Sequence, residues 1–373
     1  YYVEVELWGP KGEEVEKMGK WIVFDKRTEI SCSIGREFYG LKPWSVEHPS
    51  LYTAVIRVRD EEMNLIESVG SRFGFRTVEI DNGLLKVNGS TILLKGVVYA
   101  DANLKSRSQL EEDLRMMKLN NINAIRTAYY SPASPLFYEL CDKYGFYVFC
   151  DANIQPFSQK SKAVATDVTY SDLFVARVQD MYDRYKNHPS IIAWSLGPST
   201  DNGICMENAY KALKQKDKSR PVVFGGAQFG DNTDIVALRN ANIDVLKQFL
   251  VKNHNRPLVL LEYGETHGNT FGGYSDIWQL MREEPQLQGG FIARWNPVAV
   301  WLDGEENTLP SLVDDNLQTV PYITEIKNLY RNFDVKLLSI SQDAGEFSVA
   351  NRCDNQKLSD WTLEYIICSN LKN

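Results

Sequence analysis

The sequence is poor in the residues that build metal centres. Only 4 of its 373 residues are histidine, and none of its 6 cysteines forms a CxxC pair. A structural zinc site needs four such ligands at short spacings. There is also no GxGxxG motif after a strand, which a dinucleotide-binding fold would carry. We therefore expect neither a metal nor a cofactor.

Long apolar runs and basic runs are also missing. No stretch of about 20 apolar residues is present, so no segment is predicted to span a membrane. The net charge is −8, which disfavours nucleic acid and anionic membrane surfaces as partners. The first residues, 1–7, already alternate as a strand with no leader before them. We interpret this as the start of a shortened domain, and a periplasmic or secreted origin stays open, as does the oligomeric state.

The hydrophobic content of 43% and charged content of 24% are typical of a globular protein with a large core. Residues 1–80 read as short strands without intervening helices, which predicts an immunoglobulin-like β-sandwich. The strand candidates are the alternating run Val3–Leu7 and the segments Trp21–Phe24, Glu29–Ser33 and Leu51–Val58.

From residue 81 to 333 strands alternate with helical patterns, which implies a parallel sheet. Eight strands in about 250 residues fit a closed (β/α)8 TIM barrel better than an open sheet. The eight candidates are Ile92–Val98, Ala124–Thr127, Phe146–Asp151, Ile191–Leu196, Val222–Phe224, Ile235–Leu238, Leu258–Glu262 and Phe291–Arg294. Strand patterns return at Val335–Ile340, Glu346–Asn351 and Trp361–Ser369, so residues 334–373 are predicted to begin a second β domain.

Several segments resemble, in chain order, segments of one enzyme family. They are Phe73–Ile80, Asp113–Thr127, Phe137–Gly145, Asn187–Gly197, Leu261–Tyr263 and Gln288–Phe291. The family is glycoside hydrolase family 2, the β-galactosidase and β-glucuronidase family. The resemblance implies the same sandwich and barrel, and a β-linked carbohydrate as the partner.

The resemblance also implies a retaining mechanism with two carboxyl groups about 5–5.5 Å apart at the C-terminal ends of the strands. Glu262, at the end of the seventh strand, occupies the nucleophile position. The acid/base position at the end of the fourth strand holds Ser199, and Pro198 stands where the family has Asn. A serine hydroxyl does not deliver a proton to a glycosidic oxygen near neutral pH.

Further positions match the family's site or depart from it. The resemblance places seven residues at the substrate: Arg126, Tyr129, Asn153, Trp194, Tyr263, His267 and Trp295. Trp194 fits the protein core equally well, and His267 is shifted from the family's own histidine. Members with a metal near the acid carry Glu and His where this chain has Gln155 and Phe157, so we predict no magnesium there.

Three functions remain open at this point. The first is a degenerate family-2 barrel that binds β-linked carbohydrate with little or no turnover. The second is a working retaining β-glycosidase whose acid comes from Asp201 or Glu265, since two close carboxyls split their pKa values and leave one protonated. The third is a purely structural interaction module.

Overall fold

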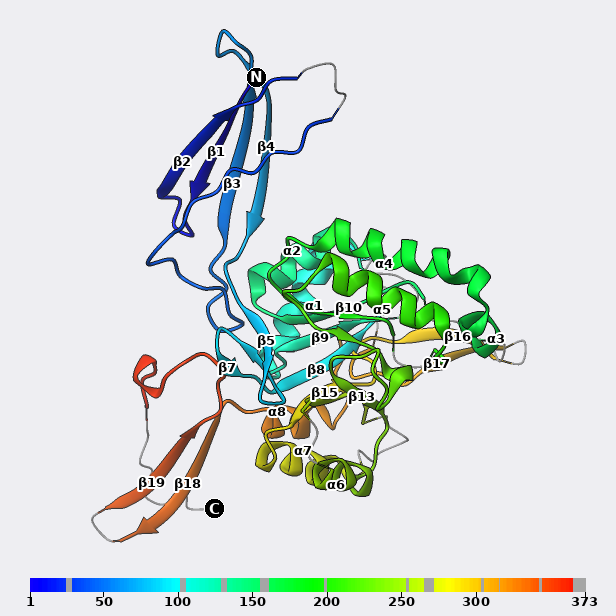
Figure 1. Cartoon of the computed structure of the whole chain (residues 1–373). Coiled ribbons are helices and arrows are strands. Elements are labelled where there is room, and N and C mark those ends of the chain that lie inside the picture. The colour runs from blue at the N-terminus through cyan, green and yellow to red at the C-terminus, as the bar shows by residue number, and fades with distance from the viewer. Residues whose placement is uncertain are drawn as a thin grey trace.

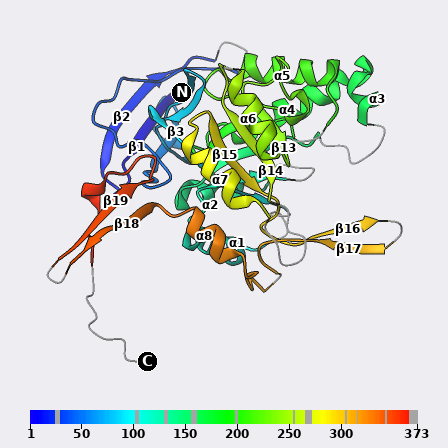
Figure 2. The ribbon, with the colours of Figure 1, turned by 90° about the horizontal axis from the view of Figure 1, so that it is seen from below.

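The computed structural model describes residues 1–24, 29–100, 105–128, 133–154, 161–197, 200–252, 255–264, 272–302, 305–314, 316–341 and 344–364. Figure 1 shows an N-terminal β-sheet that extends away from a barrel wrapped by helices. Two hairpins project from this barrel, as the view in Figure 2 makes clear. Within the described residues no helix is long and apolar enough to cross a membrane.

The N-terminal sheet consists of four antiparallel strands in the order β2-β1-β3-β4. They are β1 (Tyr2–Trp8), β2 (Glu14–Trp21), β3 (Tyr52–Arg59) and β4 (Leu65–Phe73). Strand alternation puts Glu4 and Glu6 on one face, where both are buried. Lys17 and Arg57 form ion pairs with both glutamates, which compensates the burial of their charges.

Eight parallel strands form the barrel, as the sequence predicts. They are β8 (Leu94–Tyr99), β9 (Ala124–Thr127), β10 (Tyr147–Asp151), β11 (Ile191–Ser195), β12 (Val222–Val223), β13 (Val236–Arg239), β14 (Leu258–Tyr263) and β15 (Leu287–Ile292). Their order is β12-β11-β10-β9-β8-β15-β14-β13. A parallel bridge between Val223 and Ile235 joins the two ends of this sheet, so the barrel closes.

The helices cover the outside of the barrel (Figure 1). They are α1 (Arg107–Leu119), α2 (Pro135–Tyr144), α3 (Ser161–Thr166), α4 (Ser171–Tyr185), α5 (Ile204–Lys216), α6 (Ile243–Val251), α7 (Tyr274–Glu283) and α8 (Ile323–Leu329). Local signals set their ends: a capping box of Ser106 and Gln109 starts α1, and Pro135 starts α2. Gly145 ends α2 in the left-handed conformation that favours glycine, with φ of 75°.

Side chains divide into two buried clusters according to the face of the strand that carries them. One cluster, which includes Leu260 and Tyr263, packs between the strands and the helices. The other, which includes Val259 and Leu261, fills the barrel interior. This layering is typical of a packed TIM barrel.

A three-stranded sheet connects the N-terminal sheet to the N-terminal end of the barrel. Its strands are β5 (Val78–Asp81), β6 (Leu84–Val87) and β7 (Ser90–Thr91). The Gln288 side chain, at the start of β15, exchanges hydrogen bonds with the Leu85 backbone at 2.5 and 2.9 Å.

Two side chains from the segments beside this sheet also bind the barrel domain. The fully buried Trp44 donates its indole N–H to the Asp142 carbonyl at 2.9 Å. Arg76 donates to the Pro189 and Ile191 carbonyls at 2.6 and 2.7 Å.

Two hairpins follow the barrel strands: β16 (Val298–Leu302) with β17 (Glu305–Leu309), and β18 (Phe333–Ile340) with β19 (Gly345–Asn351). The second contains two of the three strands predicted for residues 334–373. The third prediction, Trp361–Ser369, is wrong for residues 361–364, and residues 365–369 lie outside the described part. Glu29–Ser33 and residues 22–24 also form no strand. A strand requires a neighbour for its N–H and C=O groups, and in the described chain β2 and β4 are the unextended edges of their sheet.

Candidate active site

Glu262 lies near the C-terminal end of β14 and is fully buried. Its neighbours Leu260 and Tyr263 both pack on the helix side, whereas Leu261 belongs to the barrel interior. Strict alternation would therefore send Glu262 outward. The β14 pairings shift register on both sides, between Leu238 and Arg239 against β13, and between Leu260 and Tyr263 against β15. Such an irregularity re-aims a side chain, and here it brings the carboxylate to the interior Arg126.

Two arginines bind the Glu262 carboxylate. Arg126, on β9, donates from Nη2 to Oε1 at 3.2 Å, and it is itself fully buried. Arg239, the last residue of β13, donates from Nε and Nη2 to Oε2 at 2.9 and 2.5 Å. Burial alone would raise the pKa of Glu262, but Arg126 and then Arg239 outweigh it, so the pKa lies below its ordinary value. Glu262 is therefore ionised at neutral pH.

A second buried carboxylate stands behind Arg126. Asp151, the last residue of β10, accepts from Arg126 Nε at 3.0 Å. Burial raises the pKa of Asp151 despite the attraction of Arg126, and the negative charge of Glu262 adds to the rise. Arg126 thus lies between two carboxylates, and its Nη1 also donates to the Leu261 carbonyl. This network fixes the guanidinium that positions Glu262.

The end of β11 lies on the same side of the barrel, because parallel strands end together. Gly197 adopts a φ of 94° there, and its N–H binds the Ser195 hydroxyl at 3.1 Å. Thr200 is buried, with its hydroxyl 3.4 Å from the Ile154 carbonyl. Pro198 and Ser199, which come between Gly197 and Thr200 in the sequence, lie outside the described residues. The other predicted positions outside the described residues are Tyr129, Gln155, Phe157, Glu265 and His267. Asp201 and Asn153 are described, and both are exposed to solvent.

Three of the predicted substrate-binding residues belong to the buried core. Trp194, Tyr263 and Trp295 are buried in the cluster between strands and helices. The Trp194 indole N–H donates to Asp217 Oδ2 at 2.8 Å. The Arg220 guanidinium lies over the Trp194 ring, with its Cζ 4.5 Å from the centroid of that ring. The Tyr263 hydroxyl is 3.2 Å from that of Tyr274. Trp194 on β11 and Tyr263 on β14 thus lie on the outer face of their strands, and Trp295 follows the end of β15. A sugar platform at these rings stays a prediction.

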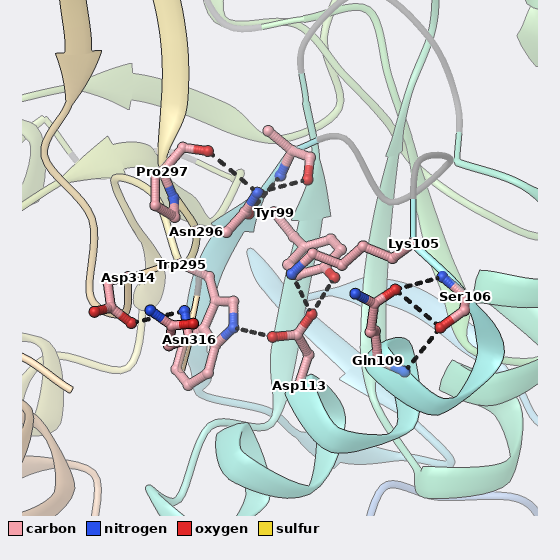
Figure 3. Close-up of polar contacts among 11 residues, drawn as sticks. Tyr99, Lys105, Ser106, Gln109, Asp113, Trp295, Asn296, Pro297, Asp314 and Asn316 are labelled. Atoms are coloured by element: carbon pink, nitrogen blue, oxygen red, sulfur yellow. Dashed lines mark hydrogen bonds and ion pairs between the residues drawn. The ribbon is translucent and has the colours of Figure 1, made fainter. Parts of the chain in front are cut away.

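Trp295 instead belongs to a group of contacts centred on Asp113 of α1 (Figure 3). Its indole N–H donates to Asp113 Oδ1 at 3.0 Å. The hydroxyl of Tyr99, at the end of β8, and the ammonium of Lys105 bind Asp113 Oδ2 at 2.5 and 2.6 Å. Asn296 exchanges two hydrogen bonds with the Ala100 backbone. These contacts fix the segments that follow β8 and β15 to α1, at the end of the barrel that carries Glu262.

Arg239 is the site residue that sequence reasoning missed. It ends the sixth barrel strand, β13. Its side chain is 39% exposed, whereas the carboxylate that it binds is fully buried. The signal that could have identified Arg239 is a cationic residue at the end of β13, the strand that pairs with β14 beside Glu262. Among the described residues, no group of three or more His, Cys, Asp or Glu is arranged to hold a metal ion.

Comparison with known proteins decides the family. The family model described as "Glycosyl hydrolases family 2, TIM barrel domain" matches residues 78–311. The family model described as "Glycosyl hydrolases family 2" matches residues 1–76. The chain belongs to glycoside hydrolase family 2. It is 35% identical over 325 residues to a β-galactosidase of Yersinia enterocolitica, covering 79% of this chain and 30% of that protein. A β-galactosidase of Yersinia pestis bv. Antiqua (strain Angola) is 38% identical over 325 residues, which again cover 79% of this chain and 30% of that protein.

Solved structures of the family share the fold. The β-glucuronidase of Parabacteroides merdae superimposes with a TM-score of 0.73 at 15% identity, covering 90% of this chain and 49% of that one. The β-galacturonidase of Eisenbergiella tayi gives 0.72 at 19% identity, covering 88% and 66%. This family-2 chain spans about a third of the length of the curated relatives it matches. The sandwich and barrel predicted from its sequence are confirmed.

Proposed function

We propose that this family-2 barrel binds β-linked carbohydrate and hydrolyses unactivated β-glycosides weakly or not at all. The observation that carries the proposal is that a carboxylate stands at the end of β14 but not at the corresponding position after β11. The end of β14 carries Glu262, ionised and bound by two arginines. The corresponding position after β11 is Ser199 in the sequence.

The Glu262 side supports a nucleophile-type site. A retaining glycosidase needs an ionised carboxylate to attack the anomeric carbon. Arg126 and Arg239 keep the negative charge on Glu262 at neutral pH, and full burial keeps bulk water from competing for it. Because Arg239 is partly exposed, it is the partner that an entering sugar can displace.

The Ser199 side supports weak turnover. General acid catalysis contributes about 10²–10⁴-fold, and a retaining enzyme uses the same residue as acid in one step and base in the next. Ser199 offers no titratable proton near neutral pH, and Pro198 offers no side-chain amide for the sugar 2-hydroxyl. Both half-reactions therefore lack assistance.

The alternative function is an active β-glycosidase that recruits another acid. Asp201 follows Ser199 by two residues and is exposed, so a rearranged loop would be needed to bring it to Glu262. Glu265 follows Glu262 by three residues. If either residue is the acid, Asp201→Asn or Glu265→Gln should abolish a wild-type activity on unactivated β-galactosides or β-glucuronides.

The test is covalent trapping on Glu262. An activated aryl β-glycoside needs no protonated leaving group, so it should form an ester with Glu262 that intact-protein mass spectrometry detects as the added sugar mass. Azide should release that sugar as a glycosyl azide, because a small anion attacks without a general base. Ser199→Glu combined with Pro198→Asn should then recover hydrolysis.

Glu262→Gln is the matched control, and it should form no adduct while keeping the size of the side chain. A wild-type turnover near the usual median of roughly 10 per second on an unactivated glycoside would contradict the proposal. A folded protein that yields no adduct with several activated sugars would leave carbohydrate binding alone. Loss of sugar binding in equilibrium titrations as well would favour the structural module.

A further inference from the structure

A cavity lies at the end of the barrel opposite Glu262. It has a volume of about 210 Å³ and is lined by residues 91–93 and Lys95 around the start of β8, by α7, by the start of β15, and by Arg331 and Arg352 at the base of the β18–β19 hairpin. We call it the basal pocket. The N-terminal face of a TIM barrel normally serves stability, so a formed cavity there calls for a chemical explanation.

The basal pocket carries an excess of positive charge. Its lining includes Lys95, Arg282, Arg331 and Arg352, and no acidic residue. One buried carboxylate beside it, Asp334, holds all three guanidinium groups: Arg331 Nε at 2.6 Å, Arg352 Nε at 2.8 Å and Arg282 Nη1 at 3.5 Å. A single carboxylate therefore balances three arginines.

These arginines keep donors that Asp334 does not use. Arg331 and Arg352 both bind Asp334 through Nε, and in the described part of the chain their Nη groups make no hydrogen bond. Burial lowers the pKa of Arg282; the charge of Asp334 opposes this decrease, and the nearby charges of Arg352 and Arg331 add to it. An additional anion would relieve this crowding of cations.

Lys95 contributes a fourth positive charge. It is 4% exposed, and its ammonium donates to two neutral oxygens, Asn332 Oδ1 at 2.6 Å and the Tyr330 carbonyl at 3.2 Å. Burial lowers the pKa of Lys95, whereas the nearby Asp354 carboxyl raises it. Burial and the charge of Glu47 raise the pKa of Asp354 to about 7, so near neutral pH this carboxyl is only partly ionised and offsets only part of the positive charge.

The basal pocket also has an apolar lining. Leu93 is half-buried and Pro285 is exposed, and both offer surface to a ligand, while Ile92, Trp278, Met281 and Leu287 form the buried layer beneath them. In that buried layer the Trp278 N–H is already bound by the Leu329 carbonyl at 2.7 Å, so the indole adds no free donor. A ligand here meets cations on one side and hydrocarbon on the other.

From this pairing we infer that the basal pocket binds a small amphipathic carboxylate, with its anionic head on the arginines and its apolar body against Leu93 and Pro285. Guanidinium groups bind carboxylates through charge-assisted hydrogen bonds, and the free Nη groups of Arg331 and Arg352 can provide them. The volume suits a ligand of the size of benzoate and excludes a sugar chain. The site is separate from the proposed carbohydrate site, and its occupation does not depend on any reaction at Glu262.

Isothermal titration calorimetry with benzoate tests the inference. We expect one saturable site per chain, with binding weakened about tenfold or more for benzamide, which has the same shape but no charge. Inorganic phosphate, an anion without an apolar body, should also bind more weakly. Benzamide or phosphate binding as tightly as benzoate would overturn the inference, and so would the absence of a saturable site.

Variants locate the binding. Arg352→Gln should weaken benzoate about tenfold, which corresponds to one charge-assisted hydrogen bond, whereas Arg177→Gln on the exposed face of α4 should not. Thr91→Trp keeps every cation and fills the cavity mouth, so it should also abolish binding, with the fold checked by circular dichroism. Arg239→Gln should leave benzoate affinity unchanged. If Arg239→Gln removes binding, or if both Arg352→Gln and Thr91→Trp retain it, the ligand lies elsewhere and the inference fails.

Discussion

Arg239 is the group whose removal should change the chemistry of Glu262 most directly without emptying the core. Arg239→Gln deletes two N–H donors, at 2.9 and 2.5 Å, from Glu262 Oε2 and removes one of its two cationic partners. Arg126 remains in place, because Asp151 and the Leu261 carbonyl hold it independently. The pKa of Glu262 should therefore rise toward its ordinary value.

The size of the rise follows from distance and exposure. Two unit charges about 4 Å apart interact by about 4 kcal/mol at an effective dielectric constant of about 20. The Arg239 side chain is 39% exposed, so solvent screening reduces this to about 1–2 kcal/mol. One pKa unit corresponds to about 1.4 kcal/mol, and we expect an increase of about one unit.

Carbon-13 NMR of the glutamate carboxyl groups measures this pKa whether or not the protein turns over a substrate. Glu262→Gln assigns the resonance by its disappearance. Arg239→Lys is the matched control: it keeps the charge but loses the fork of two donors, and should raise the pKa by less than Arg239→Gln does. An unchanged Glu262 titration midpoint in Arg239→Gln would refute the role assigned to Arg239.

Two further outcomes test the placement of core and charge. Trp194→Ala should lower the free energy of unfolding in urea by about 3–5 kcal/mol, because it empties a fully buried site. Trp21 is half-exposed, so Trp21→Ala should lower it by less than about 1 kcal/mol. A Trp194→Ala protein that keeps its stability but loses sugar binding would show that Trp194 contacts the sugar. The pKa of Asp334 is about 2: burial opposes this decrease, but Arg331 and Arg352 outweigh it. Its contribution is therefore complete above about pH 4 and is lost as the pH falls through about 2. Asp334→Asn should remove about 1–2 kcal/mol at pH 7 and little at pH 2, measured as the shift in thermal midpoint, and an equal loss at both pH values would contradict the ion-pair explanation.

Periodicity and strand order were enough to predict the barrel. Buried parallel strands are continuous apolar runs, and Leu258–Leu261 and Ile191–Trp194 have that pattern. Isolated strand predictions failed where pairing decides the outcome. Glu29–Ser33 has strand-like composition, yet composition does not supply a neighbouring strand with which to pair.

The candidate site was predictable only as far as strand ends define it. Glu262 was placed at the end of the seventh strand by its flanking residues, and Arg126 by its motif. The direction of the Glu262 side chain depended on a register shift in β14 that no residue type signals. Tyr263, which follows Glu262 across the same shift, packs against the helices. A family motif gives a residue's place along a strand, whereas the strand's local pairing decides which face it occupies.

The ion network around Glu262 gives this residue a structural role that is independent of catalysis. Arg126 is fully buried, and Glu262 and Asp151 are the two carboxylates that compensate its charge. Removing one partner of such a buried pair costs about 3–5 kcal/mol, because an uncompensated charge remains. A carboxylate at position 262 therefore stabilises the fold whether or not the barrel turns over a substrate. If Ser199 leaves the barrel with weak turnover, as we propose, the fold still requires Glu262, because Arg126 would otherwise lose one of its two buried partners.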